Sequence, residues 1–322
     1  MTIRQITVFG GSGFVGRAIV QALAREGYMV RVAVRRIGLA NGVKAFGDVG
    51  QITLMQANLR MPQSVGWAVA GSDAVVNAAG IPFQRGRQTY AAVHAEGARH
   101  IAEACKAAGI ERLVHISGIG ADNRSSRNAY LKSKVAAEDA IVTTFTAATI
   151  LRPSVVFGPA DALFTRMAGI AATAPFVPLI GDGSAKVQPV FSADVGRAVV
   201  AVLQRPDTAR TVFELGGPRV YSYRELARLV LLEIDRKKPI VGVPVPLMKL
   251  AGFFAQQIGR FGLVPPITAD QVELMVHDNV VRPGANTFAA LGIHPAAPES
   301  ILSTYLDRFR IGGRYNQHAP AG

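Results

Sequence analysis

A tyrosine and a lysine stand four residues apart, at positions 130 and 134, in the segment NAYLKSKVAAED. Because about four residues make one helical turn, Tyr130 and Lys134 would share one face of the helix that this segment predicts. A nearby ammonium group favours the ionised form of a phenol, and such a pair can move a proton at a substrate oxygen. We interpret the two residues as candidate catalytic groups; the alternative is an ordinary pair on a surface helix.

Three glycines follow the apolar run at residues 6–9 and precede a stretch in which apolar residues recur at helical spacing. Gly10 would permit a sharp turn, Gly13 a close approach of backbone N–H groups to a pyrophosphate, and Gly16 close packing of the helix on the sheet. A second apolar run follows at 28–34, so the pattern predicts a βαβ dinucleotide site rather than a plain turn. The residues assigned to this site are Gly10, Gly11, Ser12, Gly13, Phe14, Val15 and Gly16.

Two arginines stand where the second predicted strand ends. Sites for NAD usually carry an acidic residue about 20 residues past the first glycine, where it accepts hydrogen bonds from the ribose. Here no acidic residue occurs between Glu26 and Asp48, and Arg35 and Arg36 occupy that place. A guanidinium offers planar, charge-assisted donors to a ribose 2′-phosphate. The sequence therefore favours NADP(H) over NAD(H); the alternative is that both arginines are solvated loop charges.

The composition is that of a globular protein with a strong positive charge. The 322 residues are 49% hydrophobic and 18% charged, which suits one nucleotide-binding domain with a smaller appended part. The formal net charge of +13 favours a partner of negative sign, such as a phosphorylated coenzyme, an anionic membrane surface or a protein. Nucleic acid is the weakest of these candidates, because the basic residues form no arginine-rich run.

One cysteine and six histidines limit the redox and metal chemistry. Cys105 cannot form an internal disulfide, so we expect a small core residue and a reducing compartment. The histidines show no HExxH pairing, and we predict no metal site. The first strand is predicted from about Ile3, which leaves no room for a secretory signal, and no window of about 18 apolar residues predicts a membrane span. We therefore expect a cytoplasmic protein.

Short apolar runs and amphipathic segments alternate from Ile3 to about Leu151. This alternation predicts an α/β fold of the Rossmann type, a doubly wound parallel sheet with helices on both faces. After Pro159 the pieces become shorter, with Pro and Gly between them. We predict a nucleotide-binding domain at 1–158 and a smaller C-terminal substrate or docking part at 159–322, interleaved with the main sheet.

The expected elements of the first domain are strands at 6–9, 28–34, 52–55, 73–78, 112–117 and 148–151, and helices at 14–26, 62–70, 88–108 and 130–146. Further elements are expected as helices near 161–172, 192–204 and 222–235 and strands near 187–191 and 211–215. Right-handed crossovers bring the loops after the parallel strands to one edge, where a ligand would lie.

Several motifs occur along this pattern: Gly10-Gly-Ser-Gly13-Phe-Val-Gly16, Asn77-Ala-Ala-Gly80, Tyr130-Leu-Lys-Ser-Lys134, Arg152-Pro-Ser-Val-Val-Phe-Gly158-Pro and Phe191-Ser-Ala-Asp194-Val. Together they resemble the extended and atypical short-chain dehydrogenase/reductases, over residues 3 to about 235. The resemblance implies that Tyr130 is the general acid/base, that Lys134 assists it and binds the nicotinamide ribose, and that Pro153 contacts the nicotinamide. It also implies coenzyme contacts from Asn58 near the adenine and from Leu59, Ala78, Ala79 and Gly80.

Extended members of that family carry a Ser or Thr shortly after the fifth strand, where it polarises the substrate carbonyl. Here HISGIGAD supplies Ser117, thirteen residues before Tyr130, which is a spacing of short-type members. In the extended register the apolar Ile119 would occupy that position instead. Ser117 is the candidate third catalytic residue and a coenzyme contact, in a weakened catalytic set.

Near the end of the chain stands the segment ITADQVELMVHDNVV. It is similar to the nucleotide-binding accessory subunit of respiratory complex I and its bacterial relatives, an atypical branch of the same superfamily. That resemblance implies tightly bound NADPH with a structural role, in a protein that docks on a quinone-linked complex. The apolar segment from Pro246 to Gly262, which has basic residues and no acidic one, would suit an anionic membrane surface. The alternative is a helix that covers the core of the C-terminal part.

Two functions from different classes follow. The first is an NADP(H)-binding protein of the complex I accessory type, peripheral on the cytoplasmic face of the inner membrane. The alternative is a free-standing NADP(H)-dependent oxidoreductase, or an NAD-dependent epimerase/dehydratase-type enzyme, that uses Tyr130 and Lys134. No polar constellation in the C-terminal part identifies a substrate.

Overall fold

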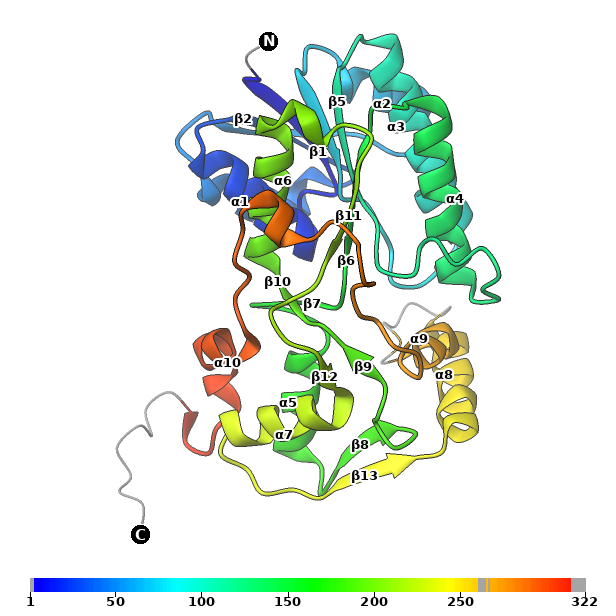
Figure 1. Cartoon of the computed structure of the whole chain (residues 1–322), viewed down its shortest axis with the longest axis vertical. Helices are drawn as coiled ribbons and strands as arrows, with labels where there is room; N and C mark the ends of the chain where they lie inside the picture. The colour runs from blue at the N-terminus through cyan, green and yellow to red at the C-terminus, as the bar shows by residue number, and fades with distance from the viewer. Residues whose placement is uncertain (1–2, 260–264, 266, 314–322) are drawn as a thin grey trace. The chain divides into compact units, whose positions relative to one another are not determined.

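A parallel sheet of seven strands forms the centre of the first of two units into which the chain divides (Figure 1). The computed structural model describes residues 3–259, 265 and 267–313. The first unit comprises the chain up to Pro153 together with Ser192–Leu215 and Val281–His294, and the remainder forms the second unit. The predicted boundary after residue 158 stays a prediction.

The sheet has the strand order β11-β6-β5-β4-β1-β2-β3, and every neighbouring pair is parallel. These strands are short runs rich in Val and Ile, and the central ones are buried along their whole length, as expected for a sheet covered on both faces. The strand order reverses between β1 and β4, which is where such folds bind ligands. The strands are β1 (Gln5–Phe9), β2 (Met29–Val34), β3 (Ile52–Gln56), β4 (Ala74–Asn77), β5 (Arg112–Ile116), β6 (Thr149–Pro153) and β11 (Val212–Leu215).

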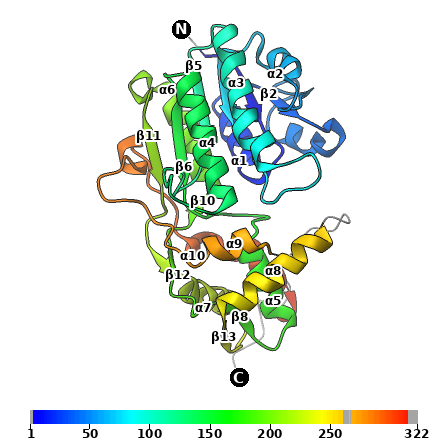
Figure 2. The same cartoon turned by 90° about the vertical axis from the view of Figure 1, so that its right-hand side faces the viewer.

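Helices cover both faces of this sheet (Figure 2). On one face α1 (Phe14–Arg25) packs beside α6 (Ser192–Gln204). On the other face α2 (Pro62–Val69), α3 (Glu96–Ala107) and α4 (Ala129–Thr144) lie over a buried apolar core. The predicted doubly wound parallel sheet is therefore confirmed, and Cys105 lies buried in this core, where burial raises its pKa to about 12.

The second unit consists of helices around small strand pairs. Its core lies between α5 (Phe164–Thr173) and α7 (Tyr223–Glu233). The strand pairs are β7 (Val156–Phe157) with β10 (Val190–Phe191), β9 (Lys186–Val187) with β12 (Tyr221–Ser222), and β8 (Val177–Ile180) with β13 (Ile240–Val243). Its other helices are α8 (Val245–Gly259), α9 (Ala269–Leu274), α10 (Pro298–Ile301) and α11 (Ser303–Leu306).

Several details of the sequence-based element assignment need correction, since the short strands β7, β12 and β13 were not expected either. The single strand expected near 187–191 is two short strands, β9 and β10, because Pro189 between them has no N–H group to donate. The segment at 177–180, for which no strand was expected, forms β8. The helix expected over 88–108 begins as a π-helical turn at Ala91–Ala95 before α3.

The apolar segment from residue 246 forms most of α8, and residues 260–262 of it lie outside the described residues. Along α8 the side chains of Leu247, Leu250, Phe253 and Phe254 are exposed. Among the helices within the described ranges, none has both the length and the apolar character needed to cross a bilayer.

Candidate functional site

The glycine turn joins β1 to α1 and leaves the first turn of that helix open. Gly10 has a φ of +76°, and the N–H of Gly13 donates to its carbonyl oxygen at 2.9 Å. Gly13 is the N-cap of α1, so no side chain caps the helix and its first turn holds no acidic residue. A helix start with uncapped N–H groups is suited to a phosphate.

A cavity of about 260 Å³ lies over this turn, at the ends of β1, β2, β3 and β4. The structure brings together around it half of the residues predicted to bind coenzyme: Gly10, Ser12, Gly13, Arg35, Asn58, Leu59, Ala78, Ala79 and Gly80. Gly11, Phe14, Val15 and Gly16 belong to the turn and to α1 without lining the cavity, and Arg36 follows Arg35. The lining also includes Arg60, Gln88 and Val93, which the sequence analysis missed.

The cavity is positively charged at the ends of β2 and β3. Arg35 follows β2 and Arg60 lies in the loop after β3, while no carboxylate residue lines the cavity among the described residues. Partial burial, together with the positive charges of Arg36 and Arg60, lowers the pKa of Arg35 from its usual value. The open helix start, the glycine cradle and this cationic end fit a nicotinamide adenine dinucleotide.

Tyr130 and Lys134, at the start of α4, do not line that cavity, but Nζ of Lys134 would lie 3.9 Å from a Cβ at Gly80, which does. The side chain of Asn128 caps this helix by accepting hydrogen bonds from the N–H groups of Tyr130 and Leu131 at 3.1 and 3.2 Å. Lys134 is buried, its Nζ lies 5.9 Å from the centre of the Tyr130 ring, and it donates to the carbonyl oxygen of Ile116 at 3.4 Å. The helix thus places the two side chains on one face, as predicted.

A buried histidine, His94, joins this helix to the loop after β4. The centres of the His94 and Tyr130 rings lie 5.6 Å apart in an edge-to-face arrangement, and Nε2 of His94 accepts a hydrogen bond from the N–H of Ile81 at 3.0 Å. The hydroxyl of Ser133 donates its proton to the carbonyl oxygen of Tyr130 at 2.6 Å. The same hydroxyl therefore accepts a hydrogen bond from the Nδ1–H of His94, at 2.8 Å. His94 therefore holds Tyr130 in place as a neutral ring.

His115 lies in β5 and Ser117 directly follows this strand, so the two residues share one face of it, and both are buried. Asn77 donates to Nδ1 of His115 at 3.1 Å, which leaves the proton of that ring on Nε2. Within the described residues neither Nε2 of His115 nor the hydroxyl of Ser117 has a hydrogen-bond partner. Ile119 is buried as well, and its N–H donates to the carbonyl oxygen of Pro153 at 3.1 Å, so the loop after β5 lies beside the end of β6.

The two buried histidines should make the protein sensitive to acid. Burial, together with the charge of Lys134, lowers the pKa of His94 and of His115 to about 3. An unfolded histidine takes up its proton near pH ~6.5, so the free energy of unfolding falls as the pH drops below that value. We expect a loss of up to about 1.4 kcal/mol per pH unit for each histidine, measured by urea unfolding between about pH 7 and 5. The variant His115→Asn should show a shallower loss; an unchanged slope would contradict this assignment.

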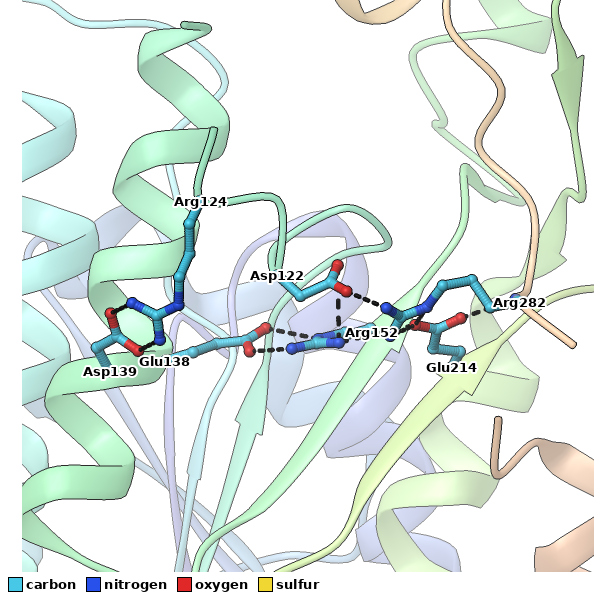
Figure 3. A network of polar contacts seen from close by, with 7 residues as sticks. All are labelled: Asp122, Arg124, Glu138, Asp139, Arg152, Glu214 and Arg282. Carbon is cyan, nitrogen blue, oxygen red and sulfur yellow. Dashed lines mark hydrogen bonds and ion pairs between the residues drawn. The ribbon is translucent and has the colours of Figure 1, made fainter. Parts of the chain in front are cut away.

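A network of ion pairs connects α4 to the ends of β6 and β11 (Figure 3). Arg152, at the end of β6, donates through Nε and Nη2 to the carboxylate of Glu138 on α4, at 3.0 and 2.6 Å. Its Nη1 lies 3.7 Å from Glu214 and 3.9 Å from Asp122. Glu214 also accepts from Nε of Arg282 at 2.8 Å. The described residues contain no cluster of three His, Cys, Asp or Glu side chains that could hold a metal ion.

Comparison with known proteins gives one family and two kinds of relative. A model of the NAD dependent epimerase/dehydratase family matches residues 6–216. The mitochondrial NADH-ubiquinone oxidoreductase 40 kDa subunit of Neurospora crassa is 33% identical over 312 residues, covering 96% of this chain and 80% of the relative. NADH dehydrogenase (ubiquinone) 1 alpha subcomplex subunit 9 of Arabidopsis thaliana is 31% identical over 95% and 78% of the two chains. A ceramide reductase of Caulobacter vibrioides is 29% identical over 77% and 76%.

Solved structures share the fold at low sequence identity. The crystal structure of gox2253 has a TM-score of 0.75 at 20% identity and covers 97% of this chain and 99% of its own. MoeE5 in complex with UDP-glucose and NAD has a TM-score of 0.71 at 18% identity, over 94% and 97%. At 18–20% sequence identity, the similarity to these two structures supports the fold alone.

Proposed function

The chain belongs to the NAD dependent epimerase/dehydratase family, and from that membership we propose that it binds NADP(H) as a tightly held coenzyme in a complex I accessory-type, quinone-linked assembly. The observation that carries the choice of coenzyme is Arg35 in a cavity lined by no carboxylate among the described residues. A carboxylate there would accept hydrogen bonds from the ribose of NAD, whereas a guanidinium pairs with a 2′-phosphate.

Replacing Arg35 by glutamine tests this choice of coenzyme. The variant keeps a hydrogen-bonding side chain and removes the charge, so NADPH should bind more weakly by about 1.5–3 kcal/mol. NADH has no 2′-phosphate, and its affinity should change little. Isothermal titration of both coenzymes, after removal of any bound nucleotide, measures the two effects; equal losses for both would exclude a 2′-phosphate contact.

We infer a structural role for the coenzyme from the names of two relatives and from the burial of Ser117. The Neurospora crassa and Arabidopsis thaliana relatives are named as subunits of NADH-ubiquinone oxidoreductase and NADH dehydrogenase. Ser117, the candidate for polarising a substrate carbonyl, is buried. We place the protein at the cytoplasmic face of the inner membrane as a peripheral partner of such a complex, and the exposed apolar side chains of α8 and the positive net charge suit that location.

A second candidate function is a free-standing oxidoreductase or epimerase. Two observations favour it: Nζ of Lys134 lies 5.9 Å from the centre of the Tyr130 ring on α4, and one relative is named as a ceramide reductase. A bound nicotinamide would supply or accept the hydride. Tyr130 would then move the proton at the substrate oxygen, and Lys134 would favour the phenolate and hydrogen-bond the ribose.

Native purification distinguishes the two functions. For the docking function, NADPH should co-purify, resist exchange during dialysis and accompany a protein that sediments with membranes, without turnover of a panel of ketones and aldehydes. For the enzyme, turnover should appear and the variant Tyr130→Phe should lose it. Tyr130-dependent turnover in a protein that does not sediment with membranes would exclude the docking function.

A further inference from the structure

A third arginine reaches the adenosine end of the cavity from a different loop. β2 and β3 are neighbouring parallel strands, with Val34 opposite Gln56, and the N–H of Ala57 donates to the carbonyl oxygen of Val34 at 2.9 Å. The residues that follow these strands therefore leave the sheet side by side. Arg35 follows the first strand and Arg60 the second, and both line the cavity.

The loop that carries Arg60 is held by several hydrogen bonds. The side-chain oxygen of Asn58 accepts from the N–H of Arg60 at 3.2 Å, and the N–H of Asn58 donates to the hydroxyl of Ser64 at 3.0 Å. Between them, the carbonyl oxygen of Leu59 accepts from Nδ1 of His100 at 2.6 Å. The backbone at Arg60 is therefore fixed at the cavity that this residue lines.

In the part of the chain that the structure describes, no acidic side chain forms an ion pair with the guanidinium groups of Arg35, Arg36 or Arg60. Across the described residues, none of them makes a hydrogen bond or ion pair through its side chain, and Nε of Arg60 is buried without a partner. Like charges gathered in this way repel one another, and a buried donor without an acceptor costs free energy. Both costs are relieved when an anion with several acceptor oxygens binds among the three groups.

We propose that Arg60 is a third ligand of the ribose 2′-phosphate, so that two loops clamp this group from two sides and the site selects the phosphorylated coenzyme. The inference rests on the proposed function, because it takes NADP(H) to be the ligand. A phosphate dianion offers three terminal oxygens, enough for guanidinium groups that approach from β2 and from β3. Asn58 contributes by fixing the turn that presents Arg60.

The test compares ligands with and without the 2′-phosphate on the full chain, freed of bound nucleotide. The variant Arg60→Gln should bind adenosine 2′,5′-bisphosphate and NADPH more weakly, on the order of tenfold or more, and should bind NADH as the wild type does. Arg60→Lys keeps the charge without the planar fork and should lie between the two. As a control, Arg25→Gln removes a positive charge in the last turn of α1, at the opposite end of this helix from the glycine turn. It should leave the affinities for adenosine 2′,5′-bisphosphate, NADPH and NADH unchanged.

Each outcome has one meaning. A selective loss of affinity for the two 2′-phosphorylated ligands supports the clamp. Equal losses for NADPH and NADH would place Arg60 on the adenine or the pyrophosphate, and unchanged affinities would remove it from the site; either result overturns the inference while leaving the proposed function intact. A wild-type protein that binds no coenzyme would overturn both. Matching thermal midpoints of the variant and the wild type without ligand show that a loss is not a folding defect.

Discussion

The variant Gly16→Ala is expected to bind the coenzyme much more weakly and to unfold more easily than the wild type. A Cβ at this position would lie 2.8 Å from both the carbonyl carbon of Gly10 and the Cα of Gly11. These are backbone atoms of the turn, so no side chain can rotate away, and overpacking of this kind costs about 1–3 kcal/mol of stability. A displaced turn would also misdirect N–H groups meant for the pyrophosphate. Losing two charge-assisted hydrogen bonds of about 1.5–3 kcal/mol each weakens binding at least roughly a hundredfold.

A second glycine gives a matched control for this prediction. Gly66 lies inside α2, and no heavy atom stands within 4 Å of the place where its Cβ would be. The variant Gly66→Ala should therefore bind NADPH normally and gain about 0.5–1 kcal/mol of stability, because alanine favours a helix over glycine. Urea unfolding and NADPH titration of both variants measure the difference. Wild-type affinity in the Gly16 variant would show that the turn does not set the coenzyme site.

The fold of the first unit could be predicted because its information is local. Each βαβ step carries its own hydrophobic periodicity, and the predicted strand at 6–9 and helix at 14–26 differ from β1 and α1 by a single residue at one end. Parallel connections then follow a handedness rule that leaves few arrangements open. The alternation predicted the strands from β1 to β6, while their order in the sheet comes from the structure.

The second unit was predicted less well because its pairings are distant in sequence. β8 is four residues long, contains Pro178 and forms only because Ile240–Val243 lies against it. The segment 281–294 likewise returns to the first unit, where the N–H of Glu214 donates to the carbonyl oxygen of Asn286 at 2.8 Å. Neither partner can be identified from the residues around it, since local periodicity says nothing about such contacts.

The candidate site shows the same division. The glycine turn and Arg35 belong to one contiguous motif, so their types and spacing alone indicated a nucleotide. His94 gains its role from Ser133, 39 residues away, and from Ile81, 13 residues away. For Arg60 the sequence offered one indication, namely a basic residue two positions after Asn58 in a loop without acidic residues. This indication points to a phosphate only once the pairing of β2 with β3 is known, because that pairing brings Arg35 beside it.

The variant Arg152→Met should be the most destabilising change in the ion network. The side chains of Glu138 and Glu214 are only 8% and 2% exposed. Removing the guanidinium would leave Glu138 as a buried charge without its hydrogen-bond donors and would weaken the support of Glu214. Breaking a buried ion pair from one side costs about 3–5 kcal/mol. Because Glu138 lies one turn beyond Lys134 on α4, the loss should also loosen the helix that carries Tyr130.

The same network supplies controls that separate burial from charge. Arg124 pairs with Asp139 on the surface of α4, with 72% of its side chain exposed, so Arg124→Met should change stability little (Figure 3). The double variant Arg152→Met with Glu138→Leu removes both members of the buried pair and should recover much of the stability lost in the single variant, because the carboxylate of Glu138 is then gone and Glu214 keeps its ion pair with Arg282. Urea unfolding of these three variants and of Glu138→Leu alone measures these differences. If Arg152→Met and Arg124→Met cost the same, or if the double variant is as unstable as the two single changes added together, the ion pair does not hold α4 against β6.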